Sequence, residues 1–170
     1  MPQLLRSTPL LLAAALLFSP RLVLSEPPNV PSASEARNLL TSIEVAPQGP
    51  QDGYDRDKFP HWHTVEGNCN TRETVLNRDG TDLDIGTDCY PDSGHWVSPY
   101  DGGEWDQASD LDIDHVVPLS NAWKSGASEW TNDDREAFAN DLDNPQLLAV
   151  TDNVRKTILL VLNCSILSKY

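Results

Sequence analysis

Basic residues are scarce in this chain of 170 amino acids. It holds 12 lysines and arginines against 26 aspartates and glutamates, which gives a formal net charge of −14 at pH 7. Proteins that bind nucleic acid tightly usually carry a basic face that neutralises phosphates, and the sequence shows no such face. The shortage argues against binding through a broad basic face, and the chain can still act on nucleic acid if a divalent cation supplies the local positive charge. A soluble extracellular surface accounts for most of the acid excess.

The chain also lacks an apolar run long enough to cross a membrane. Its first apolar stretch, residues 9–18, follows Arg6 and precedes the small residues Val23 and Ser25. A basic start, a short apolar centre and small residues at the −3 and −1 positions are typical of a secretory signal peptide. We therefore predict a signal peptide over residues 1–25 and a secreted, extracellular mature chain with no stable membrane association.

Cysteine is rare as well, with three copies at Cys69, Cys89 and Cys164. A secreted chain meets an oxidising environment in which disulfides persist. Cys69 and Cys89 both lie inside the expected domain, and we predict a disulfide between them. Closing that loop would stabilise the fold by about 3 kcal/mol in the chain-entropy model. Cys164 is left over, free or available for an intermolecular bond.

Internal repeats are absent from the sequence, and its organisation is that of one domain behind a linker. Residues 26–53 are a Pro-rich, polar linker. Within it Ser32 precedes Glu35 by three residues, a capping-box spacing that predicts a short helix ending near Leu40. The compact domain is expected over residues 54–154.

Turn residues, caps and apolar periodicity predict the elements of this domain. Thr131 is a helix cap, and Asp133 and Asp134 follow it in the first turn, where the helix dipole favours acid. Gly80 and Gly126 each end a predicted helix. The mixed, irregular order of elements predicts a small single domain of the α+β class. We expect helices over residues 70–79, 119–125 and 132–142, strands over 111–118 and 145–150, and a hairpin within 93–105.

Two aspartates and a histidine interrupt the apolar strand predicted over residues 111–118. A carboxylate beside an imidazole suits metal-assisted phosphodiester hydrolysis, with Asp114 holding a hard cation such as Mg²⁺ and neutral His115 taking a proton from water. Alternation along a strand would point these two side chains to opposite faces, so the site needs a bulge or a strand end there. The alternative is that Asp112 and Asp114 face water while His115 is a hydrogen-bonded core residue.

Several sequence blocks in the same order resemble the secreted HNH nucleases related to the C-terminal domain of GmrSD-type restriction endonucleases. The blocks are FPHW, CNTRETVLNRDG, GHWVSPYDG and LDIDHVVPL, followed by the stretch that runs to LLAV, and together they extend from about residue 54 to 150. The resemblance implies a ββα-metal (His-Me finger, HNH) element, in which a helix after the second strand brings the last metal ligand. It also implies hydrolysis of DNA or RNA phosphodiesters with a divalent metal ion, Mg²⁺ or alternatively Mn²⁺ or Zn²⁺.

Carried over by position, the resemblance assigns roles to individual residues. It makes His115 the general base and Asp114 a metal ligand. Asn144 falls at the middle position of the HNH pattern, where it would orient the imidazole through a hydrogen bond. The alternative for Asn144 is a turn residue before Pro145. Arg72, at the start of a helix, is a candidate for binding the substrate phosphate, because its guanidinium suits bidentate contact. Its alternative is a surface ion pair.

The C-terminal tail, residues 155–170, departs from the family pattern. The last metal ligand should fall at residue 155, where this chain has Arg155. A cation would be repelled by that arginine, and the apolar, β-prone TILLVL that follows predicts an aberrant or missing last helix. We therefore expect weak or no activity of this chain.

Two other hypotheses stay open. The first is a catalytically inactive secreted binding or effector module on the same fold, which the acidic charge favours. The second is a zinc hydrolase that uses His61, His63 and His115, since a His-x-His pair on a strand points both rings to one face.

Overall fold

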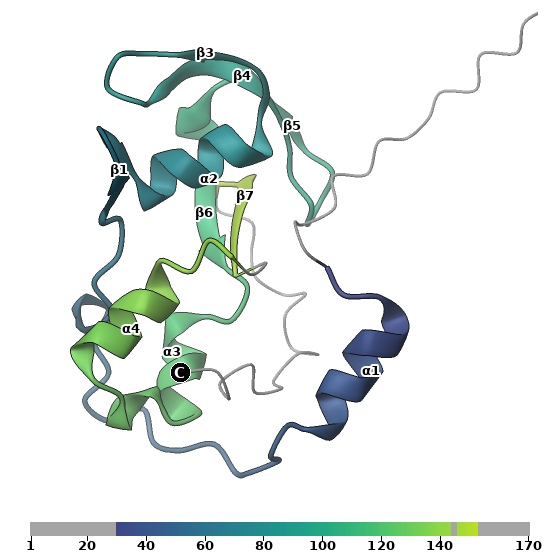
Figure 1. The fold of residues 1–170 in the computed structure, drawn as a ribbon, viewed down its shortest axis with the longest axis vertical. Helices are drawn as coiled ribbons and strands as arrows, with labels where there is room; N and C mark the ends of the chain where they lie inside the picture. Colours follow the sequence, from purple (N-terminus) through teal and green to yellow (C-terminus); the bar gives the residue numbers. More distant parts are fainter. Residues whose placement is uncertain (1–29, 144–145, 153–170) are drawn as a thin grey trace, which may run out of the picture.

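The structure, a computed structural model, describes residues 30–143 and 146–152 (Figure 1). Helices and short strands alternate irregularly, which confirms the predicted α+β class. Short 3-10 helices lie at Arg56–Lys58, Ala108–Asp110 and Ala127–Glu129. The main elements are α1 (Ala33–Thr41), β1 (Thr64–Glu66), β2 (Cys69–Asn70), α2 (Thr71–Asp79), β3 (Thr81–Ile85), β4 (Pro91–Val97), β5 (Glu104–Trp105), β6 (Leu111–His115), α3 (Leu119–Lys124), α4 (Asn132–Ala139) and β7 (Leu147–Thr151).

The strands form three small antiparallel sheets, ordered β1-β2, β3-β4-β5 and β6-β7. Helix α2 contacts both β4 and β7, and so lies between the sheet of β3, β4 and β5 and the β6–β7 pair (Figure 1). The β6–β7 pair keeps one register over its five residue pairs, from Leu111 opposite Thr151 to His115 opposite Leu147. This pair is the part of the fold that carries Asp114 and His115.

The described residues form two apolar clusters, one that includes β6 and one built from segments that flank it in the chain. Each large side chain buried in them stabilises the fold by about 2 kcal/mol through removal from water. Ile113, two residues before His115, belongs to the first cluster, and Leu119, four residues after it, belongs to the second. His115, the last residue of β6, therefore lies between the two clusters along the chain. The first cluster joins α2, β4, β6 and β7 through Val75, Leu76, Trp96, Ala108, Leu111, Ile113, Leu147 and Ala149. The second joins α3 and α4 through Phe59, Leu119, Ala122, Trp123, Ala127, Phe138 and Ala139.

Helix α2 starts and stops for local reasons. Asn70 and Glu73 form a capping box at its first turn, each side chain accepting from the other residue's backbone N–H. At its end, Gly80 closely approaches Trp96, because a Cβ at this glycine would lie 2.5 Å from the indole Nε1. That same indole donates to the carbonyl oxygen of Leu76 at 2.8 Å. The close approach therefore fixes the end of α2 on β4.

The C-terminal turn of α2 also holds β7. Arg78 and Asp79 form an ion pair, and Nη2 of Arg78 donates to the carbonyl oxygen of Leu147 at 2.6 Å. The Asp79 carboxylate accepts from the backbone N–H of Ala149 at 2.9 Å. These bonds satisfy backbone groups of β7 that its pairing with β6 leaves available.

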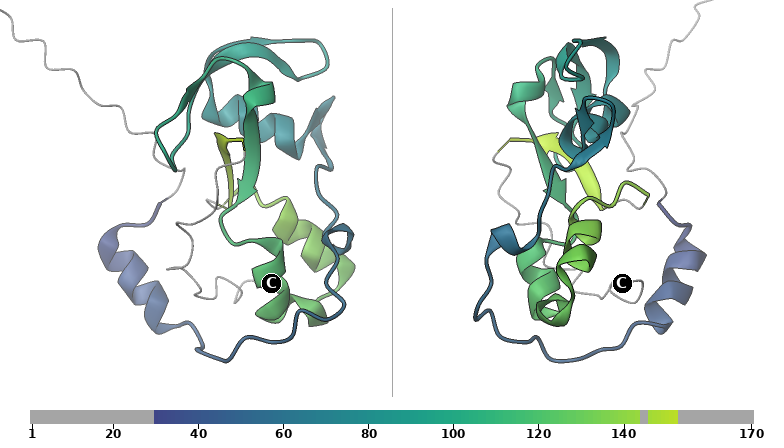
Figure 2. Two further views of the ribbon diagram at one scale, coloured as in Figure 1. Left: turned by 180° about the vertical axis from the view of Figure 1, so that it is seen from behind. Right: turned by 60° about the vertical axis from the view of Figure 1, so that its left-hand side comes forward.

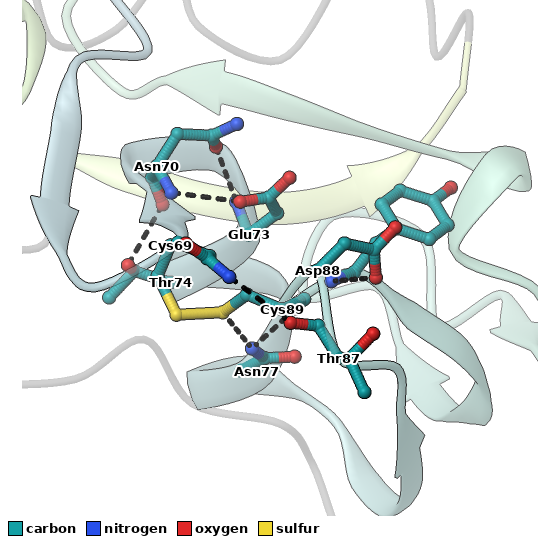
Figure 3. Close-up of a disulfide and its surroundings, with 10 residues drawn as sticks. Cys69, Asn70, Glu73, Thr74, Asn77, Thr87, Asp88 and Cys89 are labelled. Carbon is teal, nitrogen blue, oxygen red and sulfur yellow. Dashed lines mark hydrogen bonds between the residues drawn. A yellow bond between two sulfur atoms is a disulfide. The ribbon is translucent and has the colours of Figure 1, made fainter.

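The predicted disulfide between Cys69 and Cys89 is confirmed, with a Cα–Cα distance of 5.2 Å (Figure 3). It ties the residue that precedes the cap of α2 to the turn between β3 and β4. Asn77 of α2 adds a second link, since its Nδ2 donates to the carbonyl oxygen of Cys89 at 3.1 Å. The disulfide thus holds α2 against the β3–β4 hairpin. Cys164 lies outside the residues that the structure describes.

The helices predicted within the described residues are confirmed, and two predicted boundaries are corrected, one of a strand and one of a helix. Strand β6 ends at His115, before the predicted Pro118, because Pro118 caps α3 and its carbonyl oxygen accepts from Asn121. Helix α4 ends at Ala139, before the predicted residue 142, because the backbone N–H of Asp141 turns to the carbonyl oxygen of Phe138, three residues back, and no longer follows the α-helical spacing of four. Strands β1, β2 and β3 were not predicted; β1 and β2 have three and two residues, and β3, in which Leu83 and Ile85 alternate with acidic residues, is short and largely exposed.

Helix α1 forms where its capping box predicts it, with Ser32 as the cap. It buries none of its residues, and it lies apart from the other helices in every view (Figures 1 and 2). Among the helices that the structure describes, none has the length and apolar content needed to cross a membrane.

Candidate active site

A cavity of about 480 Å³ opens beside the end of β6. It brings together three residues that the sequence singles out, Asp114, His115 and Arg72, together with Asp112. Three further side chains line it that the sequence did not assign to the site, although Trp62 and Tyr100 lie in the family-like blocks FPHW and GHWVSPYDG. These are Arg56 in the first 3-10 helix, Trp62 in the loop that follows it, and Tyr100 in the turn after β4.

His115 is buried, with 3% of its surface exposed. Its Nε2 lies 3.0 Å from the carbonyl oxygen of Ala139. A carbonyl only accepts hydrogen bonds, so Nε2 of the neutral ring carries the proton and Nδ1 keeps a lone pair. The imidazole is therefore set as a proton acceptor at Nδ1.

Burial lowers the pKa of His115 from its ordinary value of 6.5 to about 4. The hydrogen bond to Ala139 opposes that shift, the positive charge of Arg56 adds to it, and the charge of Asp114 opposes it. The ring is thus neutral at physiological pH. The same low pKa makes it a weaker base than an exposed histidine.

Trp62 covers one side of this imidazole. The two rings are stacked, with centroids 6.0 Å apart and an interplanar angle of 27°. Trp62 has a φ of 63°, a left-handed conformation that is strained for a bulky side chain. Asn140 holds the segment on both sides of it, because Nδ2 donates to the carbonyl oxygen of Pro60 and Oδ1 accepts from the backbone N–H of His63.

Asp114 is also buried, with 4% of its surface exposed. The hydroxyl of Tyr100 donates to its Oδ2 at 3.0 Å. Burial and the neighbouring carboxylate both raise the pKa of Tyr100, so the phenol stays protonated and remains a donor. Asp112 is exposed at the same cavity, two residues along the strand. Because the register of β6 is regular up to His115, the strand end rather than a bulge lets Asp114 and His115 share the cavity.

Arg72 extends from the first turn of α2 into the cavity wall. Its Nη2 donates to the carbonyl oxygen of Leu111 at 2.9 Å and lies 3.5 Å from that of Ala108. Arg72 forms no ion pair within the described part of the chain, and its role at the cavity stays a prediction. Arg56 is exposed at the same cavity and likewise pairs with no acid among residues 30–143 and 146–152.

The donors at this cavity fit a hard cation better than zinc. No three His, Cys, Asp or Glu side chains gather as a metal site among the described residues. His63 pairs with Glu136 at 3.2 Å, and Nδ1 of His61 lies 2.7 Å from the carbonyl oxygen of Phe59, so the proposed zinc set is not assembled. Asp114 offers the carboxylate oxygen that Mg²⁺ uses when water and substrate phosphate complete its shell.

Two predicted positions cannot be placed at this site. Asn144 and Arg155 both lie outside the residues that the structure describes. Within the described residues, one hydrogen bond orients the imidazole, that between Nε2 of His115 and the backbone carbonyl of Ala139. The role of Asn144 and the effect of Arg155 stay predictions.

Comparison with known proteins gives two matches. The family model described as "GmrSD restriction endonucleases, C-terminal domain" matches residues 33–159. A protein of Arthroderma benhamiae, described as an uncharacterized secreted protein, is 67% identical over 130 residues, which cover 76% of this chain and 64% of the relative. This chain thus spans less than two thirds of that relative's length. The prediction of a secreted protein is confirmed by this relative, and no solved structure matches the chain.

Proposed function

This chain belongs to the family of the GmrSD restriction endonuclease C-terminal domains, and from that membership we propose that it is a secreted nuclease that hydrolyses nucleic-acid phosphodiesters. One observation supports this most directly. A neutral His115 with a free Nδ1 lone pair faces a cavity that also holds a buried carboxylate, Asp114, and two arginines.

The proton chemistry follows from the environment of His115. Nδ1 takes a proton from water, the water oxygen attacks phosphorus, and the bond to the leaving oxygen breaks. The leaving oxygen gains a proton from solvent, so a phosphodiester and water yield a phosphomonoester and an alcohol. The carbonyl of Ala139 keeps the required tautomer, and the stacked Trp62 keeps the ring from turning away.

The proposed cation is Mg²⁺, with Mn²⁺ as an alternative. Asp114 would hold it, and Asp112 is close enough along the strand to contribute through water. Such an ion supplies positive charge for the phosphate and the leaving oxygen. Tyr100 orients the Asp114 carboxylate by donating to Oδ2. Arg155, at the expected position of the last ligand, would weaken the hold on the ion in this chain.

A second candidate function, binding without hydrolysis on the same fold, has one specific observation in its favour. Burial disfavours the charged form of His115 and so lowers its pKa to about 4. A base this weak takes a proton from water less readily than one whose pKa lies near the working pH. The two functions share the cavity and differ only in whether a phosphodiester is cut.

Nicking of supercoiled plasmid DNA separates the two. We expect the purified secreted chain to nick plasmid slowly in Mg²⁺, to stop in EDTA, and to lose nicking in His115→Ala. His95→Ala is the matched control, because His95 is half-exposed on β4 and does not line the cavity. Equal nicking by His115→Ala and the wild type would remove His115 as the base. If the wild type neither nicks plasmid nor cuts single-stranded RNA in Mg²⁺ or Mn²⁺, the result would favour the binding function.

A further inference from the structure

The few basic residues of this domain are unevenly spread. Between residues 30 and 152 the sequence holds seven lysines and arginines against 25 aspartates and glutamates. Two of the seven, Arg56 and Arg72, line the one cavity that also contains His115 and Asp114. Because the domain as a whole is acidic, a pair of arginines at one site makes that site the most favourable one for binding an anion.

The cations outside this cavity are occupied elsewhere or lie on other surfaces. Arg135 is buried and donates to the backbone carbonyls of Lys58, Ala127 and Trp130. Arg78 pairs with Asp79.

The remaining cations do not approach the cavity either. Lys58 donates to Gly53 and lies 5.0 Å from the centroid of the Trp123 ring. Arg37 is on the separate helix α1, and Lys124 is in the last turn of α3. The described surface outside the cavity is therefore almost wholly acidic in its charged groups.

The two arginines are suited to one phosphate in different ways. Arg72 is held in place, because its Nη2 donates to the carbonyl oxygen of Leu111. Its other nitrogens make no hydrogen bond within the described residues and remain as donors. Arg56 is exposed at the cavity mouth. A guanidinium held inside the cavity and an exposed one beside it match the planar, two-donor recognition of phosphate oxygens.

We propose that Arg56 and Arg72 form a phosphate-binding subsite beside His115, and that the acidic surface around it makes the site select short single-stranded oligonucleotides over long duplexes. The proposal rests on the proposed function and names the substrate class of that same site. Duplex DNA carries one negative charge for about every 1.7 Å of its axis. Phosphates that extend beyond the cavity therefore lie near carboxylates of the protein surface and are repelled by them. At physiological salt this repulsion acts over a screening length of about 8 Å.

This arrangement predicts a salt dependence of binding affinity that differs from that of ordinary nucleic-acid binders. Their affinity falls as salt rises, because bound counterions are released from the phosphates. Here salt screens the repulsion of every phosphate outside the cavity. The affinity for a short oligonucleotide should fall with rising salt, whereas the affinity for a long duplex should rise.

The test is a binding measurement, so it does not depend on turnover. Fluorescence anisotropy would compare a labelled single-stranded tetranucleotide with a labelled duplex of many turns, in EDTA, at low and at physiological salt. We expect tighter binding of the tetranucleotide and a loss of about tenfold in Arg56→Gln, the size of one lost charge-assisted contact. Arg72→Gln should lose as much, and if it fails to fold, Arg56→Gln carries the test.

Arg37→Gln is the matched control, because it removes the same charge from α1, outside the cavity. It should leave tetranucleotide binding unchanged. Equal losses in Arg37→Gln and Arg56→Gln, tighter binding of the duplex at low salt, or undetectable tetranucleotide binding would each overturn the subsite. Binding as expected without any cleavage of plasmid DNA or RNA would instead leave the subsite standing and contradict hydrolysis.

Discussion

Nε2 of His115 lies 3.0 Å from the carbonyl oxygen of Ala139, and this bond joins the last residue of β6 to the last residue of α4. The carbonyl belongs to the C-terminal turn of a helix, where backbone acceptors lack intrahelical partners. The imidazole satisfies that acceptor, and in return its tautomer is fixed. The position at which α4 ends therefore determines which nitrogen of His115, the proposed base, carries the proton.

The burial of His115 makes folding stability depend on pH in a defined window. Its pKa is about 4 in the folded protein and 6.5 ordinarily. Between these values the unfolded chain binds the proton and the folded chain does not, so stability is full above pH 6.5 and falls as pH drops towards 4. The loss from this group should reach about 3 kcal/mol. Urea unfolding of wild type and His115→Gln in EDTA should show a shallower pH dependence in the variant.

Trp62 should control the ionisation of His115. Replacing Trp62 by alanine opens the stacked face of the imidazole to water, so the pKa of His115 should rise from about 4 towards 6.5. NMR titration of the imidazole Cε1 proton would measure this. Trp130→Ala, which alters the second cluster without touching the cavity, is the control and should leave the pKa in place. An unchanged pKa in Trp62→Ala would mean that other groups exclude the water.

Asn140 should be one of the more costly polar residues to remove. Its buried side chain accepts from Thr71 at 2.7 Å and from the His63 backbone, and donates to the carbonyls of Pro60 and Glu136. Asn140→Ala leaves several of these partners unsatisfied and should lower the free energy of unfolding by about 3 kcal/mol. Chemical denaturation measures it. A loss below about 1 kcal/mol, the net value of one ordinary hydrogen bond, would show that water replaces the lost bonds.

The disulfide should be a major stabilising element. Reducing the Cys69–Cys89 bond, or replacing both cysteines by alanine, should cost about 2 to 4 kcal/mol. Thermal unfolding with and without reductant would measure the loss, with the double alanine variant as a control that reductant cannot affect. Peptide mapping without reduction should recover this pair and leave Cys164 unpaired within the chain. Finding Cys164 joined to either partner would contradict the pairing.

The sequence by itself determined the α-helices of the described domain and half of the candidate site. Capping boxes at Ser32, Asn70 and Thr131 place the starts of α1, α2 and α4 within a few residues, because caps act on neighbouring backbone groups. The pair Asp114 and His115 is equally local, since two polar chemistry-bearing residues stand out against an apolar strand.

Only the tertiary structure decided what surrounds that pair. Arg56, Trp62 and Tyr100 lie between 15 and 59 residues before His115 in the chain, and although Trp62 and Tyr100 fall within the family-like blocks, neither block indicates that its side chain reaches the cavity beside His115. The partner of the imidazole is the backbone carbonyl of Ala139, a group that every residue has and that no sequence pattern can mark. Packing of the two apolar clusters sets these positions, because contacts between distant segments depend on how whole elements fit together and not on their own residues.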